Sequence, residues 1–209
     1  MGIRIDLHVH TSRYSPCSRI DPARLVNQAQ RAGLDGLVIT EHNRQWPQEE
    51  LDELVTRSQA PGFILFSGLE YTSTQGDVLI YGLTPEQADV FQPGLEPEEV
   101  VHRVADLGGL CVAAHPTRAG AGFDERILNI PFAALEVASA TMKEHEQRLA
   151  ARLAAGMGIP GVAASDAHLA KEIGACCTEF DAAVRSAKDL HDALRSGRFR
   201  CVNRSEPRT

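Results

Sequence analysis

Short apolar runs alternate with amphipathic stretches along most of this chain. The apolar runs predict strands at residues 3–9, 36–40, 63–69, 78–81, 110–114, 134–137 and 161–165, and residues 176–180 form one further extended segment. Helical spacing of apolar residues, with Asp, Pro or Gly at the ends, predicts helices at residues 22–33, 48–58, 98–107, 141–156 and 187–196. Continuous apolar strands that alternate with helices are typical of a parallel, helix-covered sheet. The pattern therefore predicts an α/β fold with a closed or nearly closed barrel, formed by one domain over residues 1–209.

Nearly every predicted strand ends in a side chain that can bind a metal ion. The set consists of His8, His10, His42, Glu70, His115, Asp166 and His168. In α/β barrels the carboxyl ends of the strands meet at one face, where the chemistry takes place. Buried imidazoles and carboxylates are costly unless they are paired, and cations at this face would pair with all of them. Because the set is rich in histidine and too large for one ion with an open position, we predict two or three divalent transition-metal ions: Zn, Mn or Fe.

Strand geometry indicates which of these side chains share a face. His8 and His10 are two residues apart on a strand, so they point the same way, and Asp166 and His168 have the same spacing. A carboxylate has two oxygens, so Glu70 is suited to bridge two ions.

Two further acidic residues accompany this set. The strands 63–69 and 78–81 are spaced as a hairpin, which would place Asp77 beside Glu70 as a further candidate ligand. Glu41 and His42 are adjacent and face different ways. We favour His42 as the ligand and expect Glu41 either to support the site or to be solvated.

Composition narrows the classes of partner. The chain has 209 residues and a formal net charge of −7, which argues against a polyanion such as duplex DNA, so we expect no nucleic-acid polymer as partner. This charge does not exclude a small phosphorylated substrate, because a metal ion can supply positive charge locally. No apolar run is long enough to span a bilayer, so we expect no membrane partner. Five cysteines without a disulfide-like framework favour a reduced, cytoplasmic protein. The oligomeric state stays open.

The chain resembles the polymerase and histidinol phosphatase (PHP) superfamily of metal-dependent phosphoesterases. The resemblance covers nearly the whole sequence and rests on five segments in order: residues 6–11 (DLHVHT), 39–43 (ITEHN), 68–71 (GLEY), 113–116 (AAHP) and 165–168 (SDAH). It implies a distorted (β/α)7 barrel with a cluster of two or three metal ions. By position, it implies one ion held by His8, His10, Glu70 and Asp166, a second by Glu70 and His115, and a third by His42 and His168.

The sequence departs from the family pattern at two places. Many members have another His or Asp shortly after the first motif, where this chain has Ser15, Pro16 and Cys17, which puts the third ion in doubt. Cys17 could replace the missing ligand or be a structural loop residue. Many members also have a His near the start of the fourth strand, where this chain has Asp77. The hairpin would let Asp77 serve the second ion.

These features favour hydrolysis of a small phosphomonoester or phosphodiester by a hydroxide generated at the metal centre. Arg118, three residues after His115, is the first candidate to bind phosphoryl oxygens, followed by Arg13 and Arg44, although solvated arginines would explain all three positions. If no third ion binds, His168 or His42 could protonate the leaving group.

Two other functions stay open. Amidohydrolases that cleave carbon–nitrogen or lactone bonds also begin with a His-x-His strand, but many of them use a modified lysine at a middle strand. This chain has only Lys143, Lys171 and Lys188, none at such a position. The second alternative is a non-catalytic metal-binding module.

Overall fold

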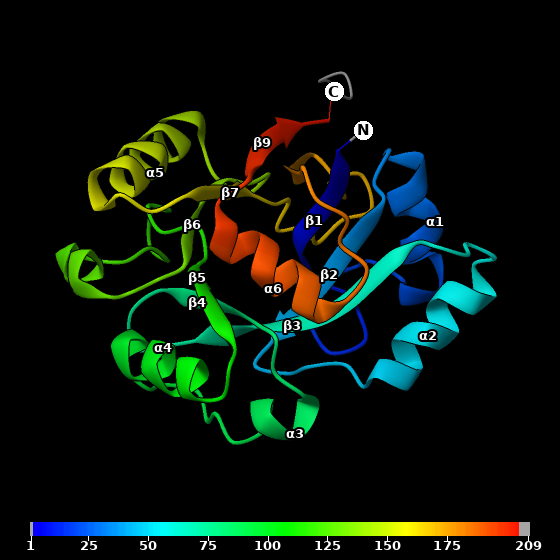
Figure 1. Cartoon of the computed structure of the whole chain (residues 1–209), viewed down its shortest axis with the longest axis horizontal. Coiled ribbons are helices and arrows are strands. Elements are labelled where there is room, and N and C mark those ends of the chain that lie inside the picture. Colours follow the sequence, from blue (N-terminus) through cyan, green and yellow to red (C-terminus); the bar gives the residue numbers. More distant parts are fainter. Residues whose placement is uncertain (1, 205–209) are drawn as a thin grey trace.

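The computed structural model describes residues 2–204; the remaining residues of the predicted domain 1–209 lie outside the described part. Within it, nine strands form one sheet in the order β7-β6-β5-β4-β3-β2-β1-β8-β9 (Figure 1). The strands are β1 (Ile3–Val9), β2 (Gly36–His42), β3 (Ile64–Thr72), β4 (Asp77–Tyr81), β5 (Leu110–Ala113), β6 (Ala134–Ala138), β7 (Gly161–Ala163), β8 (Cys176–Phe180) and β9 (Phe199–Asn203). The helices are α1 (Pro22–Arg31), α2 (Gln48–Arg57), α3 (Pro85–Ala88), α4 (Pro97–Asp106), α5 (Glu144–Met157), α6 (Ala187–Ser196) and a 3-10 turn η1 (Glu125–Asn129).

The mixed α/β fold with a nearly closed sheet confirms the predicted fold class, but the sheet is less regular than a (β/α)7 barrel. Two blocks are parallel, β1-β2-β3 and β5-β6-β7. The strand β4 joins them by pairing antiparallel with both β3 and β5, as the predicted hairpin requires. The strands β8 and β9 extend the sheet antiparallel beyond β1, and β9 has no counterpart among the predicted strands.

Side chains link the two ends of the sheet. The Thr178 hydroxyl on β8 donates to the Ala163 carbonyl (2.9 Å) and accepts from the Ala163 amide on β7 (3.1 Å). Close by, the Cys201 thiol of β9 lies 3.3 Å from the Gly161 carbonyl. These contacts bring β7 against β8 and β9 and complete the barrel-like shape.

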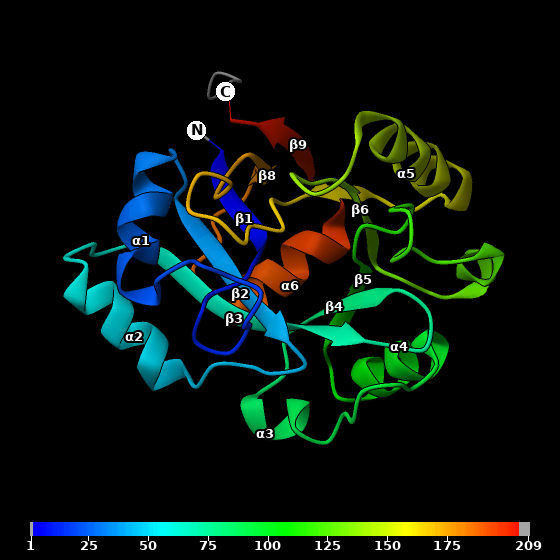
Figure 2. The same ribbon diagram turned by 180° about the vertical axis from the view of Figure 1, so that it is seen from behind.

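Three apolar clusters hold the helices to the sheet. Residues of α1 and α2 pack on β1, β2 and β3, while α4, α5 and the η1 segment pack around β3 to β6. The third cluster joins the sheet to α6, which lies across the centre of the sheet in Figures 1 and 2. The helix α1 begins as the sequence predicts, because the Asp21 carboxylate accepts a hydrogen bond from the Ala23 amide and Pro22 occupies the first helical position.

An irregularity at the end of β1 shapes the site. The pairing of β1 with β2 shifts register between Asp6 and Val9, as in a β-bulge. Leu7 consequently belongs to the cluster with α6, whereas Val9 packs with the α1 and α2 cluster. The chain between β1 and α1 therefore changes direction at the point where His8 and His10 leave the strand.

Within residues 2–204, no helix is both long enough and apolar enough to cross a membrane.

Candidate metal centre

His8 and His10 face each other at the end of β1. Their Nε2 atoms are 3.0 Å apart. The Nδ1 atom of His8 lies 3.0 Å from Glu136 Oε1, and that of His10 lies 3.3 Å from Ser15 Oγ. If each Nδ1 carries the proton and donates it to its oxygen neighbour, both Nε2 lone pairs point at the same space. Two lone pairs at this separation repel unless a shared proton or a metal cation lies between them, and a metal ion fits this donor set.

Two buried carboxylates share that space. Glu70 places one oxygen 3.4 Å from His8 Nε2 and the other 3.3 Å from His10 Nε2. Asp166 Oδ1 lies 3.4 Å from both of these nitrogens. Burial acts to raise the pKa of Glu70, yet the surrounding imidazoles, that of His8 first, outweigh it and hold the pKa well below its usual range. At Asp166, too, burial acts to raise the pKa, but the imidazoles of His8 and His10 outweigh it and lower the pKa. The site therefore keeps both carboxylates ionised.

Glu70 also contacts two more imidazoles from neighbouring strands. The register of β2 and β3 pairs His42 directly with Glu70, and His42 Nδ1 lies 2.9 Å from Glu70 Oε2. From the loop after β5, His115 Nε2 lies 3.0 Å from Glu70 Oε1 and 3.9 Å from Asp77 Oδ2. The β3–β4 hairpin thus brings Asp77 to the same end of the sheet as Glu70, as predicted. Burial and the nearby Glu70 charge raise the pKa of Asp77.

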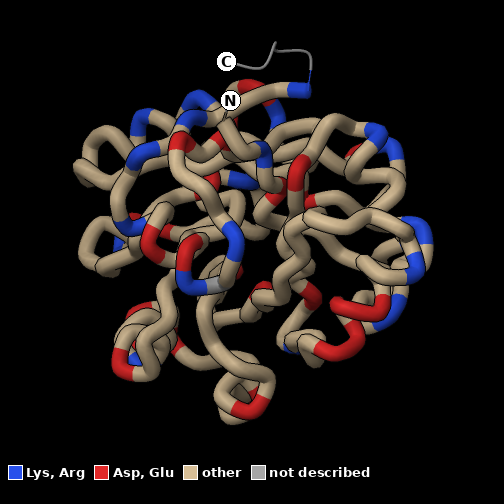
Figure 3. Tube along the Cα trace, turned by 45° about the vertical axis from the view of Figure 1, so that its right-hand side comes forward, with Lys and Arg blue, Asp and Glu red and all other residues tan. Residues whose placement is uncertain are grey.

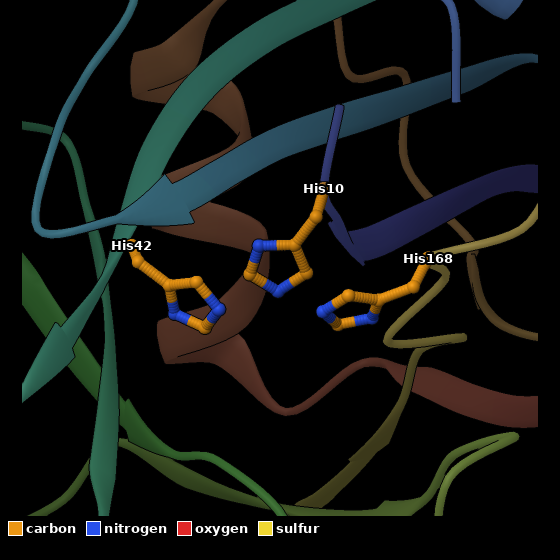
Figure 4. A group of neighbouring side chains, drawn as sticks. All are labelled: His10, His42 and His168. Carbon is orange, nitrogen blue, oxygen red and sulfur yellow. The ribbon is translucent and has the colours of Figure 1, made fainter. Parts of the chain in front are cut away.

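The described residues form three groups whose possible ligand atoms all lie within 4.8 Å of one another. They are His8–His10–Asp166, Glu70–Asp77–His115 and His10–His42–His168. Figure 4 shows the third group, with rings from three separate segments turned toward a common space. The structure therefore brings together all eight side chains predicted as ligands, and adds His10 to the predicted third set. That these side chains bind metal stays a prediction.

The backbone is strained at two members of the site. His115 has φ of 29° and Asp166 has φ of 51°, values in or beside the left-handed region that non-glycine residues rarely adopt. Such conformations persist only where the surroundings impose them, and they gather at functional sites. At His115, the backbone N–H donates a 2.7 Å hydrogen bond to Glu136 Oε2, which helps to fix this conformation.

The predicted catalytic residues occupy different positions. Arg118 lies at the edge of the site, where its Nη1 donates to Asp166 Oδ2 at 2.8 Å. His168 is partly exposed, and its Nδ1 lies 3.0 Å from the Asp166 carbonyl. Burial and the neighbouring His10 lower the pKa of His168. Arg13 is exposed and pairs with Glu50 on α2 at 3.2 Å, so it does not contact the groups described above.

Glu41 is fully buried, so the expectation that it could be solvated is wrong. Its carboxylate accepts hydrogen bonds from the Thr11 amide (3.1 Å) and hydroxyl (2.5 Å), from the Ser15 hydroxyl and from the Trp46 indole (2.9 Å). Because Ser15 in turn contacts His10 and the His42 amide, Glu41 supports the loop that carries both imidazoles.

Two side chains at the site were missed by sequence reasoning, and a third residue that it offered lies outside the site. Glu136 contacts both His8 and His115, and its only signal in the sequence is an acid within the otherwise apolar run at residues 134–138. Thr141 donates to Asp166 Oδ2 at 2.6 Å and leaves no recognisable signal. Cys17, offered as a replacement ligand, is exposed and belongs to none of the three groups of described residues.

Comparison with known proteins shows what the chain resembles. Residues 144–199 match the family model "PHP-associated". An uncharacterized protein of Methanocaldococcus jannaschii is 28% identical over 124 residues, which are 54% of this chain and 68% of that protein. A two-domain Bacteroides vulgatus protein, described as containing a predicted PHP-like metal-dependent phosphoesterase, superposes with a TM-score of 0.73 at 17% identity, over 97% of this chain and 65% of that one. The family-model match and the shared fold agree with the resemblance to the PHP superfamily that the ordered motifs indicate.

One comparison corrects the expectation about partners. Endonuclease Q, in complex with a 27-mer duplex substrate carrying an abasic lesion, has the same fold, with a TM-score of 0.71 at 16% identity. The match covers 94% of this chain and 57% of the endonuclease. A protein with this fold acts on a DNA duplex, so the prediction that no nucleic-acid polymer is a partner was wrong. Net charge alone could not support that exclusion.

Proposed function

We propose that this protein is a metal-dependent phosphoesterase that holds two or three divalent ions at the ends of β1, β2, β3 and β5 and in the loop after β7. The observation that carries the proposal is the convergence of the Nε2 atoms of His8 and His10, which lie 3.0 Å from each other and 3.3 to 3.4 Å from oxygens of Glu70 and Asp166. His8, His10, Glu70 and Asp166 would hold one ion. Glu70, Asp77 and His115 would hold a second, and His10, His42 and His168 line the weaker third position.

The ions would supply a hydroxide at neutral pH and positive charge next to the phosphoryl group. The residues of the chain have separate tasks. Glu70 lies between the groups and can join them, because its two oxygens face different imidazoles. Arg118 uses one nitrogen to orient Asp166, and its remaining guanidinium N–H groups can bind a phosphoryl oxygen.

His168 has two possible tasks, and its environment favours one of them. Its lowered pKa keeps the ring neutral at pH 7, with a lone pair free for a metal. A general acid at the same position would need the protonated ring. We therefore favour His168 as a ligand over His168 as the proton donor to the leaving group.

The test measures bound metal and phosphate release together. Purified protein is stripped with a chelator, reloaded with Zn, Mn or Fe, and assayed on a panel of phosphomonoesters and phosphodiesters. We expect turnover that disappears with the metal and is lost in Glu70→Gln, but that persists in Glu49→Gln, a control at an exposed position on α2. Metal-loaded protein that hydrolyses no phosphoester, yet opens lactones or amides, would establish the amidohydrolase alternative. Metal binding without any turnover would establish the non-catalytic alternative.

The substrate is either a small phosphoester or a nucleic-acid phosphodiester, and one observation favours the second. Arg44, two residues after His42, stacks its guanidinium on the Tyr14 ring at 4.3 Å. No carboxylate of the described residues forms a salt bridge with Arg44. Trp46 supports Tyr14 edge-on at 5.4 Å. Arginine stacked on an aromatic ring is suited to bind a nucleobase beside its phosphate.

Trp46 is the only tryptophan of the chain, so its fluorescence reports on this cluster. We expect a dinucleotide to change Trp46 emission and glycerol phosphate to leave it unchanged. We also expect Arg44→Gln to raise KM for the dinucleotide but not for glycerol phosphate. Equal KM changes for both compounds would remove the argument for a nucleotide.

A further inference from the structure

Glu136 joins two of the three candidate ion groups through the two oxygens of one carboxylate. Oε1 lies 3.0 Å from His8 Nδ1, in the group at the end of β1. Oε2 accepts a 2.7 Å hydrogen bond from the backbone N–H of His115, in the group with Glu70 and Asp77. The carboxylate itself projects from β6, a strand that contributes no side chain to the three groups. A single side chain therefore sets the position of one imidazole and the backbone of another.

The burial of Glu136 needs an explanation that packing alone does not give. Its side chain is fully buried, and no arginine or lysine of the described residues pairs with it. A buried carboxylate is expensive unless a cation pairs with it, and the ion-pair neighbour of Glu136 is the His8 imidazole at 3.0 Å. Glu179 is a buried glutamate of the same chain that meets this cost in the usual way, by pairing with Arg4 at 2.7 Å and Arg200 at 3.0 Å. For Glu136 the neighbouring cations would be those of the metal centre.

The two contacts of Glu136 have different physical effects. An ionised carboxylate only accepts hydrogen bonds, so it requires a proton on His8 Nδ1 and leaves the Nε2 lone pair facing His10. The negative partner also makes the imidazole a stronger ligand. The second contact holds the amide of His115, whose φ of 29° is unfavourable for a residue with a side chain. That contact fixes the direction from which the His115 ring approaches Glu70.

We propose that Glu136 is a positioning residue that selects the His8 tautomer and couples the first and second ion groups, so that its loss weakens both. The proposal rests on the proposed metal centre, but it concerns the preparation of that centre and not the reaction. Loss of a carboxylate that orients a metal-bound histidine typically lowers metal affinity by about 10- to 100-fold.

The principal variant is Glu136→Gln, with Glu179→Gln as the matched control. Glutamine has one acceptor oxygen, so it cannot serve both His8 Nδ1 and the His115 amide. We expect Mn²⁺ or Co²⁺ titration calorimetry to show about 10- to 100-fold weaker binding of both ions in Glu136→Gln. The Co²⁺ absorption spectrum should change as well, because the ligand geometry changes. In Glu179→Gln we expect lower thermal stability with metal affinity unaltered.

A second readout needs no metal. Nitrogen-15 NMR of histidine-labelled, metal-free protein distinguishes Nδ1–H from Nε2–H tautomers. We expect His8 as the Nδ1–H form in the wild type and a mixture in Glu136→Gln. Where the Gln variant does not fold, Glu136→Asp, which is too short to keep both contacts, takes its place.

The outcomes separate this proposal from the proposed function. Unchanged metal affinity and an unchanged His8 tautomer in the folded variant would overturn it, as would an equal loss of affinity in Glu179→Gln. A wild type that binds metal but turns over no phosphoester would overturn the proposed function, and the metal titrations would still test the role of Glu136. If the wild type binds no metal, the proposed coupling of the ion groups is wrong. The NMR measurement of the His8 tautomer then alone tests whether Glu136 orients His8.

Discussion

Replacing Glu41 by glutamine tests whether a buried carboxylate organises the loop beneath the metal centre. The two oxygens of Glu41 accept four hydrogen bonds, two each, from Thr11, Ser15 and Trp46. An amide keeps only one acceptor oxygen. A hydroxyl donor can rotate and accept from the new NH2 group, but the Thr11 amide and the Trp46 indole can only donate. In either orientation of the amide, one buried N–H loses its acceptor.

This geometry sets the size of the effect. A buried donor left without an acceptor costs about 1–3 kcal/mol, and the remaining hydrogen bonds lose the strength that a charged acceptor gives. We therefore expect Glu41→Gln to lower the free energy of unfolding by about 2–4 kcal/mol. For a chain of this length, such a change corresponds to roughly 4–16 °C in Tm.

Urea unfolding followed by Trp46 fluorescence measures the change directly, because Trp46 is the only tryptophan and contacts Glu41 itself. The measurement is made in chelator, so that the result reports on the loop and not on bound metal. Glu49→Gln, at an exposed position on α2, is the control and should change stability by less than about 0.5 kcal/mol. A destabilisation of Glu41→Gln as small as that of the control would refute the reasoning.

Three other predictions use independent assays. Saturating Mn²⁺ at about 100 times its Kd should add about 2.7 kcal/mol and raise Tm by roughly 5–11 °C, measured by calorimetry, and a chelator should reverse the shift. Asp77→Asn should reduce the number of tightly bound ions by one while the first group keeps its ion, measured by elemental analysis after dialysis; unchanged stoichiometry would remove Asp77 from the ligand set. Cys17 is exposed and should react with a thiol reagent in the folded protein, although burial and nearby carboxylates raise its pKa and slow the reaction. Cys176 and Cys177, whose pKa burial raises to about 12, should react only after unfolding, and labelling of either in the folded protein, located by peptide mapping, would contradict the fold of β8.

Local patterns in the sequence suffice for most of the elements. The run Ile3–Val9 and the segment Cys176–Phe180 coincide with β1 and β8, because each is an apolar or β-branched run bounded by polar turns. The last strand, Phe199–Asn203, was missed because it follows a helix after only two residues and mixes Arg, Cys and Asn with its apolar residues. It forms a strand because it pairs with the edge of β8, and this tertiary contact cannot be read from the local sequence.

Some residues of the candidate site could likewise be placed together from the sequence, and others could not. His42 and Glu70 could be placed together because both end neighbouring parallel strands, and the structure pairs them in register. Glu136 could not, because its role depends on the distance from β6 to His8 on β1, two strands that are not neighbours in the sheet. The bulge between Asp6 and Val9 was equally hidden, since alternation within a strand contains no record of an inserted residue.

The failed exclusion of nucleic acid shows how a global quantity misleads about a local one. A formal net charge of −7 counts Glu70, Asp77 and Asp166, among the acidic residues drawn in red in Figure 3, as free negative charges. If these residues hold metal ions as proposed, a phosphodiester at this site would meet them through those ions, and two divalent ions would add four positive charges at that one place. The relevant electrostatics would be those of the proposed loaded centre with Arg118 at its edge, and they would favour an anion at the carboxyl ends of the strands even on an acidic protein.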